Sequence, residues 1–187
     1  MAKKIAQSNL TKSTKVNRAP QSRTIFISHS SKDEWIVTPF IDKVLNLGIG
    51  IPRNKIFYTS NEDTTIKSGQ DFRKAIQKKM QNAKVVIQII TENYRQSEVC
   101  LNEMGAAWVL STNVIPFILP PINFQNVGFI HSATQLLKLN NEKDLYKFYD
   151  DHKELKTTNV NFNVSNYHRQ ITEFLEIINH GNYGYRR

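Results

Sequence analysis

Residues 84–90 read KVVIQII, a short run of mainly apolar and β-branched side chains. A run of this length and composition is typical of a strand that is buried on both faces of a sheet. Three similar runs are TIFIS at 24–28, KIFYTS at 55–60 and VIPFIL at 114–119. Proline cannot donate to a strand ladder, so Pro116 places the last run near a sheet edge or a bend.

Segments with helical spacing of apolar residues separate these runs. The first has Thr38 as its predicted N-cap and Pro39 as its first helical residue, and Gly48 and Gly50 end it. Its predicted apolar face is Ile36, Phe40, Val44 and Leu47, and further helices are expected at 70–83, 96–111, 142–155 and 166–179. The apolar residues 134–139 predict a short fifth strand or a helix. Alternating strands and helices predict an α/β fold: a flavodoxin-like, doubly wound parallel sheet of four or five strands with helices on both faces.

The chain has 187 residues and a formal net charge of +9, which at first suggests a nucleic-acid partner. The excess lies at the ends, because residues 1–23 hold six basic residues and no acid, and Arg186 and Arg187 end the chain. The rest is nearly neutral, so we expect no nucleic-acid partner. We predict a basic, disordered arm at 1–22, one folded domain at 23–180 and a flexible tail at 181–187.

Several classes of protein are disfavoured. The sequence has no run of about 18 apolar residues and no apolar segment of the secretory type near Met1, so we expect no membrane span and a cytoplasmic protein. Cys100 is the single cysteine and the five histidines are scattered, so we expect no disulfide and no metal site. The GxGxxG, GxxxxGK[ST] and GxSxG motifs are absent, which disfavours a Rossmann dinucleotide site, a P-loop and an α/β-hydrolase.

Ligands of such sheets bind beyond the carboxyl ends of the strands. The helix predicted after the third strand begins near Ser97 and carries Cys100 and Glu103. At about 100° per residue, Leu101, Met104 and Trp108 form the predicted core stripe of this helix, with Glu103 on its margin. A carboxylate on a buried margin is partly desolvated, which raises its pKa. The alternative from the pattern alone is a half-exposed glutamate on an amphipathic helix.

Three segments, in order, resemble the TIR (Toll/interleukin-1 receptor) family, particularly its bacterial members. FISHSSKDE at 26–34 resembles the first strand and following loop, and IFYTSNEDTTIKSGQDF at 56–72 resembles the second strand and the long BB loop. Ser97-x-x-Cys100-x-x-Glu103 resembles the family's enzymatic signature. The likeness covers roughly residues 23–120.

The resemblance implies a TIR fold and cleavage of NAD⁺ at the nicotinamide–ribose bond, with Glu103 as the catalytic residue. NAD⁺ is then the substrate, and no cofactor is implied. Lys67 is placed to meet the pyrophosphate, whereas Phe72 can stack on a base or pack in the core, and Asp33 steadies the first loop. The residues implied in NAD⁺ binding are His29, Ser30, Ser60, Lys67, Gly69, Phe72, Ser97 and Cys100.

The family also implies active sites completed between subunits. For so short a chain it implies a separate sensor or effector protein, and a role in antiphage defence. One departure is Val99, where many family enzymes have tryptophan. Two alternatives stay open: a non-catalytic TIR scaffold that assembles through its BB loop, and a nucleoside N-glycosidase or deoxyribosyltransferase of related fold. Product choice among ADP-ribose, a cyclic isomer and a conjugate is not fixed by the sequence.

Overall fold

A parallel five-stranded sheet forms the centre of the computed structural model, which describes residues 25–58, 72–110, 113–128, 131, 134–155 and 163–181. The strands are β1 (Ile25–Ser28), β2 (Ile56–Tyr58), β3 (Val85–Ile90), β4 (Asn113–Ile118) and β5 (Leu137–Lys138). Their spatial order is β2-β1-β3-β4-β5, and all pairs are parallel. The predicted flavodoxin-like α/β fold is therefore confirmed, and the apolar run at 134–139 supplies the fifth strand.

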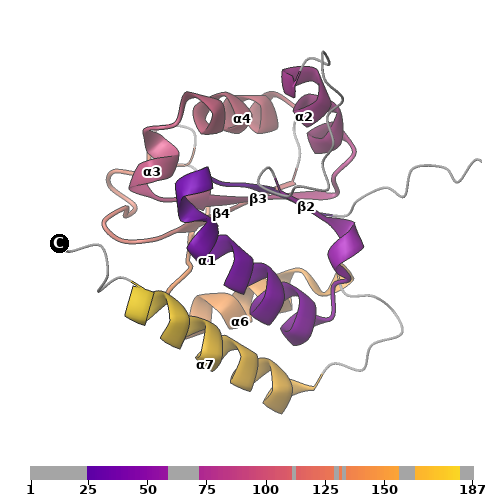
Figure 1. The fold of residues 1–187 in the computed structure, drawn as a ribbon, viewed down its shortest axis with the longest axis vertical. Helices are drawn as coiled ribbons and strands as arrows, with labels where there is room; N and C mark the ends of the chain where they lie inside the picture. Colours follow the sequence, from indigo (N-terminus) through magenta and orange to yellow (C-terminus); the bar gives the residue numbers. More distant parts are fainter. Residues whose placement is uncertain are drawn as a thin grey trace, which may run out of the picture.

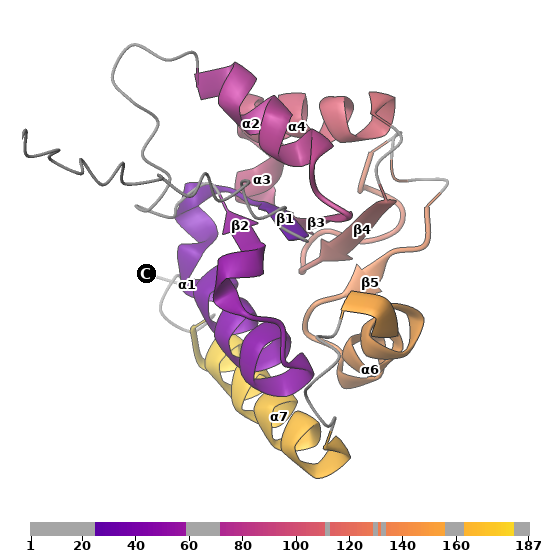
Figure 2. The same cartoon turned by 90° about the vertical axis from the view of Figure 1, so that its right-hand side faces the viewer.

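Helices cover both faces of the sheet (Figures 1 and 2). One face carries α1 (Glu34–Pro39), its continuation η2 (Phe40–Ile49), α6 (Glu142–Asp151) and α7 (Val164–Gly181), and the other carries α2 (Phe72–Gln81), α3 (Glu92–Arg95) and α4 (Glu98–Val109). Single turns η1 (Ser31–Asp33), η3 (Arg53–Lys55) and η4 (Lys153–Leu155) join them. The helix predicted over 96–111 corresponds to α4, which is shorter than expected. A separate short helix, α3, ends before Ser97, and Ser97 caps the start of α4.

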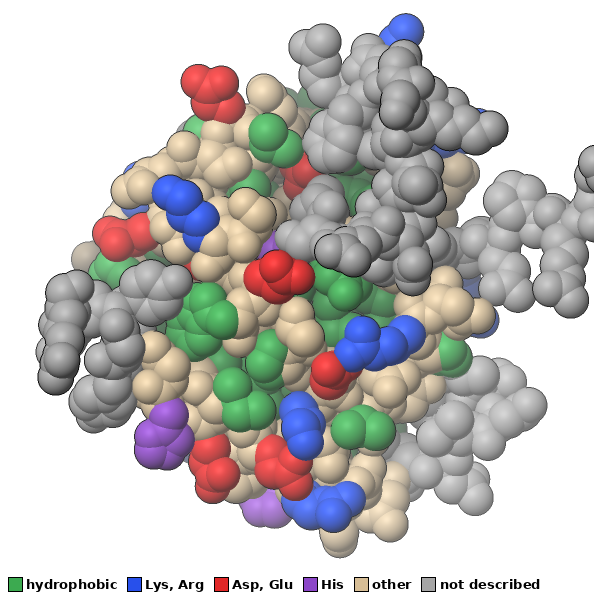
Figure 3. Space-filling view, viewed as in Figure 1, with side chains coloured by type: hydrophobic (Ala, Val, Ile, Leu, Met, Phe, Trp, Pro, Cys, Tyr) green, Lys and Arg blue, Asp and Glu red, His purple; other side chains and the backbone are tan. Residues whose placement is uncertain are grey.

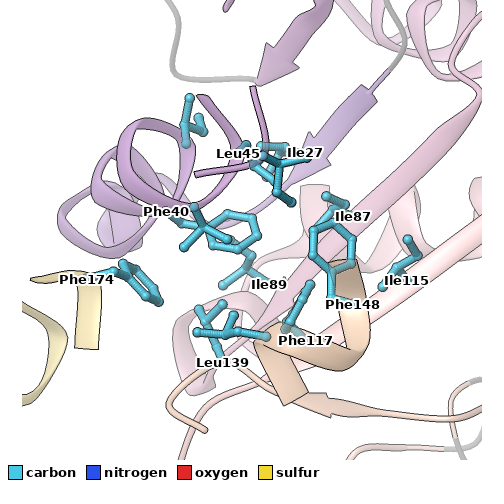
Figure 4. Close-up of a cluster of buried hydrophobic side chains, with 14 of the residues drawn as sticks. Ile27, Phe40, Leu45, Ile87, Ile89, Ile115, Phe117, Leu139, Phe148 and Phe174 are labelled. Carbon is cyan, nitrogen blue, oxygen red and sulfur yellow. The ribbon is translucent and has the colours of Figure 1, made fainter. Parts of the chain in front are cut away.

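The larger core lies between the sheet and the α1, α6 and α7 layer (Figure 4). Four phenylalanines from four elements meet there: Phe117 of β4 lies 5.4 Å from the Phe40 ring and 5.3 Å from the Phe148 ring, and Phe40 lies 5.8 Å from Phe174. These centroid distances are in the range that aromatic pairs prefer. The rings bind η2, α6 and α7 to the same stretch of sheet.

The first helix differs from its prediction. It begins at Glu34, not at Pro39, and Pro39 lies inside it, where η2 continues the chain with a wider, π-type turn. Proline removes one helical hydrogen bond, and a π-type turn is a recognised way for a helix to accommodate such a site. The wider turn changes the periodicity of the buried face, so Leu47 is 52% exposed although helical spacing predicted it inward.

Two glycines near the end of η2 have different tasks. Gly50 takes φ 87° at the C-cap, which confirms it as the residue that ends the helix. Gly48 lies inside η2 instead, where an added Cβ would be 2.8 Å from the Cδ2 atom of the Tyr167 ring. Gly48 therefore allows α7 to pack closely on η2.

Several predictions concern residues outside the described ranges, namely the basic arm at 1–22 and the tail beyond Gly181. Within the described ranges, no helix has the length and apolar composition needed to cross a bilayer. On the described part of the face drawn in Figure 3, acidic and basic side chains are interspersed rather than gathered by sign.

Candidate active site

Glu103 lies on the buried face of α4, where it is 5% exposed. The other buried residues of this helix are Cys100 and Ala107. The predicted core stripe was wrong in two of its three members, because Leu101 is 41% and Trp108 63% exposed. Apolar residues lie all round α4, so their periodicity does not identify the buried face. The structure moves Glu103 from the margin to the middle of that face.

Ser28, the last residue of β1, forms a hydrogen bond with the Glu103 carboxylate. The Oγ atom of Ser28 donates to Oε2 of Glu103 at 2.5 Å, and the Tyr94 hydroxyl lies 3.1 Å from the same Oγ. Because the single Ser28 proton goes to Glu103, Tyr94 is the donor of its pair. Oε1 of Glu103 is also buried, and no hydrogen bond to it is present among the described residues.

Burial dominates the electrostatics of this group. Desolvation raises the pKa of Glu103 from its ordinary value of 4.5 to about 7, and the hydrogen bond from Ser28 opposes part of that rise. Burial likewise raises the pKa of the Cys100 thiol to about 11 and that of the Tyr94 hydroxyl further still. Near neutral pH, Glu103 is therefore the group among these three that changes charge.

A pocket of about 420 Å³ opens beside Glu103, between α2 and α4. Among the described residues, most of its lining is apolar or uncharged, and Glu103 is the one ionisable side chain. The lining residues are Ile76, Gln77, Met80, Val99, Asn102, Glu103 and Ala106. An apolar cleft with a few polar groups is the usual form of a small-molecule site.

The loops after β1 and β3 are tied together beside this region. Asp33 is buried, and its two carboxylate oxygens accept hydrogen bonds from Thr91 Oγ1 at 2.5 Å and Asn93 Nδ2 at 2.7 Å. Thr91 also caps α3 by accepting from the Tyr94 amide at 3.0 Å. Asp33 therefore has the loop-steadying position that the sequence analysis gave it.

Four of the other predicted binding residues lie in the described part of the chain, and none of these four lines the pocket. His29 and Ser30 follow β1 and are buried, and burial lowers the pKa of His29. Ser97 caps α4 by accepting from the Cys100 amide at 3.3 Å, and Cys100 packs against Ile90 and Tyr94. Ser60, Lys67 and Gly69 lie outside the described residues, as does the side chain of Phe72.

Two important side chains were not singled out from the sequence. Ser28 ends the first predicted strand, and the alternation of side chains along β1 directs it to the opposite face from Ile27. Tyr94 lies among polar residues in the sequence, where no apolar periodicity marks it as buried, and only the fold brings its hydroxyl to Ser28. No group of three or more His, Cys, Asp or Glu side chains that could hold a metal ion occurs within the described ranges.

Comparison with known proteins agrees with the resemblance carried by the motifs. A family model described as TIR domain matches residues 25–152. The chain belongs to the TIR-domain family. This match includes Ser28, the pocket and Glu103.

The relatives differ in how much of each chain is covered. The TIR-domain chain is 35% identical over 124 residues to the uncharacterized protein YddK of Bacillus subtilis. The aligned residues make up 66% of this chain and 46% of YddK. The chain thus spans about half the length of that relative. Its fold is similar to the TIR domain of the Toll-related receptor TRR-2 from Hydra magnipapillata, with a TM-score of 0.52, 16% identity and coverage of 70% of this chain and 96% of that one. A looser likeness, with a TM-score of 0.42, 14% identity and 84% coverage of each chain, is to the TIR domains of the activated Roq1 resistosome.

Proposed function

We propose that this TIR domain cleaves NAD⁺ at the nicotinamide–ribose bond, with Glu103 as the catalytic carboxylate. The observation that supports this most is a buried carboxylate beside an apolar pocket, held through one oxygen by Ser28 while the other oxygen has no partner among the described residues. A structural glutamate on an amphipathic helix has no need of this arrangement, because burying its charge costs stability.

The chemistry needs one carboxylate rather than the two of an ordinary glycosidase. When the C–N bond breaks, its electron pair goes to the pyridine nitrogen, and nicotinamide leaves as a neutral molecule that needs no general acid. Ionised Glu103 can then hold a ribose hydroxyl through Oε1 and stabilise the positive charge that develops on the ribose. Water adding to that carbon, with loss of a proton to solvent, gives ADP-ribose, whereas attack by an atom of the same molecule gives a cyclic product.

A second candidate, a scaffold that works by assembly, is favoured by the outer face of α4. Leu101, Trp108 and Val109 are exposed there, and Val99 lies at the pocket in place of the usual tryptophan. The enzyme and the assembly are compatible, and we propose that self-association of the domain accompanies activity, as the resemblance implies. The physiological role proposed is an NAD⁺-derived signal or NAD⁺ depletion in antiphage defence, with a second protein as sensor or effector.

Nicotinamide release from NAD⁺, followed by chromatography of the co-product, tests the enzyme. Wild type is compared with Glu103→Ala at high protein concentration, with Glu98→Ala as the control because Glu98 is an exposed glutamate of the same helix. Loss of a charge-stabilising group at the reacting centre should lower the rate about 100-fold or more. The control should keep the wild-type rate.

Each outcome decides between the candidates. Release that is lost only in Glu103→Ala supports the enzyme, and the co-product distinguishes hydrolysis from cyclisation. Release that survives in Glu103→Ala contradicts the catalytic assignment. If the assembled wild type releases no nicotinamide, free nucleosides are tried next, and silence on both substrates leaves the scaffold as the function. A dilute monomer that is fully active at nanomolar concentration would contradict the role of self-association.

A further inference from the structure

A fully buried glutamine lies in the middle of the central strand. Gln88 is 0% exposed, and both its amide atoms, Nε2 and Oε1, are without a hydrogen-bond partner among the described residues. Its neighbours along β3 on the same face are Val86 and Ile90, which pack in the clusters under α2, α3 and α4. An amide is costly at a position that an apolar residue of the same size could fill, and such groups in native proteins normally have a partner.

The sheet register shows where that partner is to be found. Gln88 is flanked by Ser28 on β1 and by Pro116 on β4. Paired residues of neighbouring parallel strands point to the same face and lie about 4.8 Å apart. Pro116 has no side-chain polar atom, so the polar neighbour of Gln88 in this row is Ser28.

Ser28 is also the residue that donates to Glu103, so it contacts Glu103 and is the sheet neighbour of Gln88. Two buried groups next to Ser28 therefore have polar atoms without partners among the described residues, the amide of Gln88 and Oε1 of Glu103. Tyr94 of α3 and Cys100 of α4 are the titratable side chains that respond to the charge of Glu103; burial is the larger cause of their raised pKa values, and both stay neutral near pH 7.

We propose that Gln88 is a positioning residue for Glu103: its side-chain amide and Oε1 of Glu103 bind one shared hydrogen-bonding group, a water molecule in the free protein. The amide N–H donates to this water, and the water donates to Oε1. With Ser28 on the other oxygen, the carboxylate is then held at both oxygens in one orientation. This inference deepens the proposed function and rests on it only for its kinetic consequence.

The test follows the titration of Glu103 by ¹³C NMR of carboxyl-labelled protein, with the signal assigned by its loss in Glu103→Gln. Gln88→Met keeps the length of the side chain and removes the amide. A hydrogen bond that favours the ionised form lowers a pKa, so its loss should move the Glu103 titration upward by about one pH unit. Gln170→Met is the matched control, because Gln170 is also a buried glutamine, on α7 at the other face of the sheet, and its Oε1 has no partner in the described part of the chain.

A Glu103 titration that is the same in wild type, Gln88→Met and a second variant, Gln88→Leu, would overturn the proposal, whether or not the protein cleaves NAD⁺. So would a shift of equal size in Gln170→Met. If wild type releases nicotinamide, Gln88→Met should lower kcat about 10-fold with little change in KM, and the pH profile should move with the titration. If the titration moves and wild type cleaves no NAD⁺, the positioning role stands and the proposed function fails.

Discussion

The two faces of the sheet are built on different principles. Under α1, α6 and α7 lies one continuous apolar core, in which Phe40, Phe117, Phe148 and Phe174 pack ring against ring (Figure 4). Under α2, α3 and α4 lie two smaller apolar clusters, and buried polar side chains occupy the same face. Gln170 is a buried polar side chain on the first face, but the hydrogen-bonded group Ser28, Tyr94 and Glu103 lies on the second, where the proposed reaction would take place.

The largest expected effect is on the apolar face. Phe117→Ala removes a ring that contacts both Phe40 and Phe148, and a buried Phe→Ala substitution costs about 3–5 kcal/mol of unfolding free energy. Denaturant unfolding measures this loss. Nicotinamide release per folded molecule should stay within about twofold of wild type. A loss of stability below about 1 kcal/mol, or a collapse of activity in the folded fraction, would contradict the separation of the two faces.

A smaller effect is expected where polar groups steady the loops. Asp33→Ala leaves the buried Thr91 hydroxyl and the partly buried Asn93 amide without their acceptor, which should cost about 1–3 kcal/mol. Thermal or denaturant unfolding checks this value. Asp42→Ala is the control, because Asp42 pairs with Arg53 where both side chains are substantially exposed. Equal losses in the two variants would show that burial of Asp33 contributes nothing particular.

The smallest effect is expected at the surface. Lys43 of η2 pairs with Glu173 of α7, and both side chains are partly exposed. Lys43→Met keeps the aliphatic stem and removes the charge, and exposed pairs of this kind contribute about 0–1 kcal/mol. The difference in unfolding free energy should shrink further in high salt. A loss as large as that of Phe117→Ala would mean that the ion pair, and not the apolar core, fixes α7.

The sequence predicted the sheet well, because β-branched runs such as 84–90 are a local signal. It predicted the buried face of α4 poorly, because Leu101 and Trp108 are as apolar as residues of a core and only tertiary packing leaves them exposed. Glu103 was found through its motif rather than through periodicity. Ser28 of β1 and Tyr94 of α3 come together beside it in the fold, and no local sequence pattern reports such convergence.

The free energy of unfolding of wild type and Glu103→Gln, measured from about pH 4 to about pH 8, tests most directly whether Glu103 is a charge buried for chemistry. Because burial raises its pKa from 4.5 to about 7, the unfolded state loses the proton first as the pH rises. Wild type should therefore lose on the order of 3 kcal/mol relative to Glu103→Gln between pH 4.5 and 7.

Glu103→Gln also serves as the reference that removes the contributions of other titratable groups from the comparison. Burial lowers the pKa values of His29 and His131, so both residues reduce stability as the pH falls below 6.5, and this contribution cancels between the two proteins. At pH 8, Glu103→Gln should be at least as stable as wild type and should release no nicotinamide. Two results would contradict the claim that Glu103 is retained for catalysis at the expense of stability. One is that the unfolding free energies of wild type and Glu103→Gln change with pH in parallel, and the other is that Glu103→Gln loses both stability and activity.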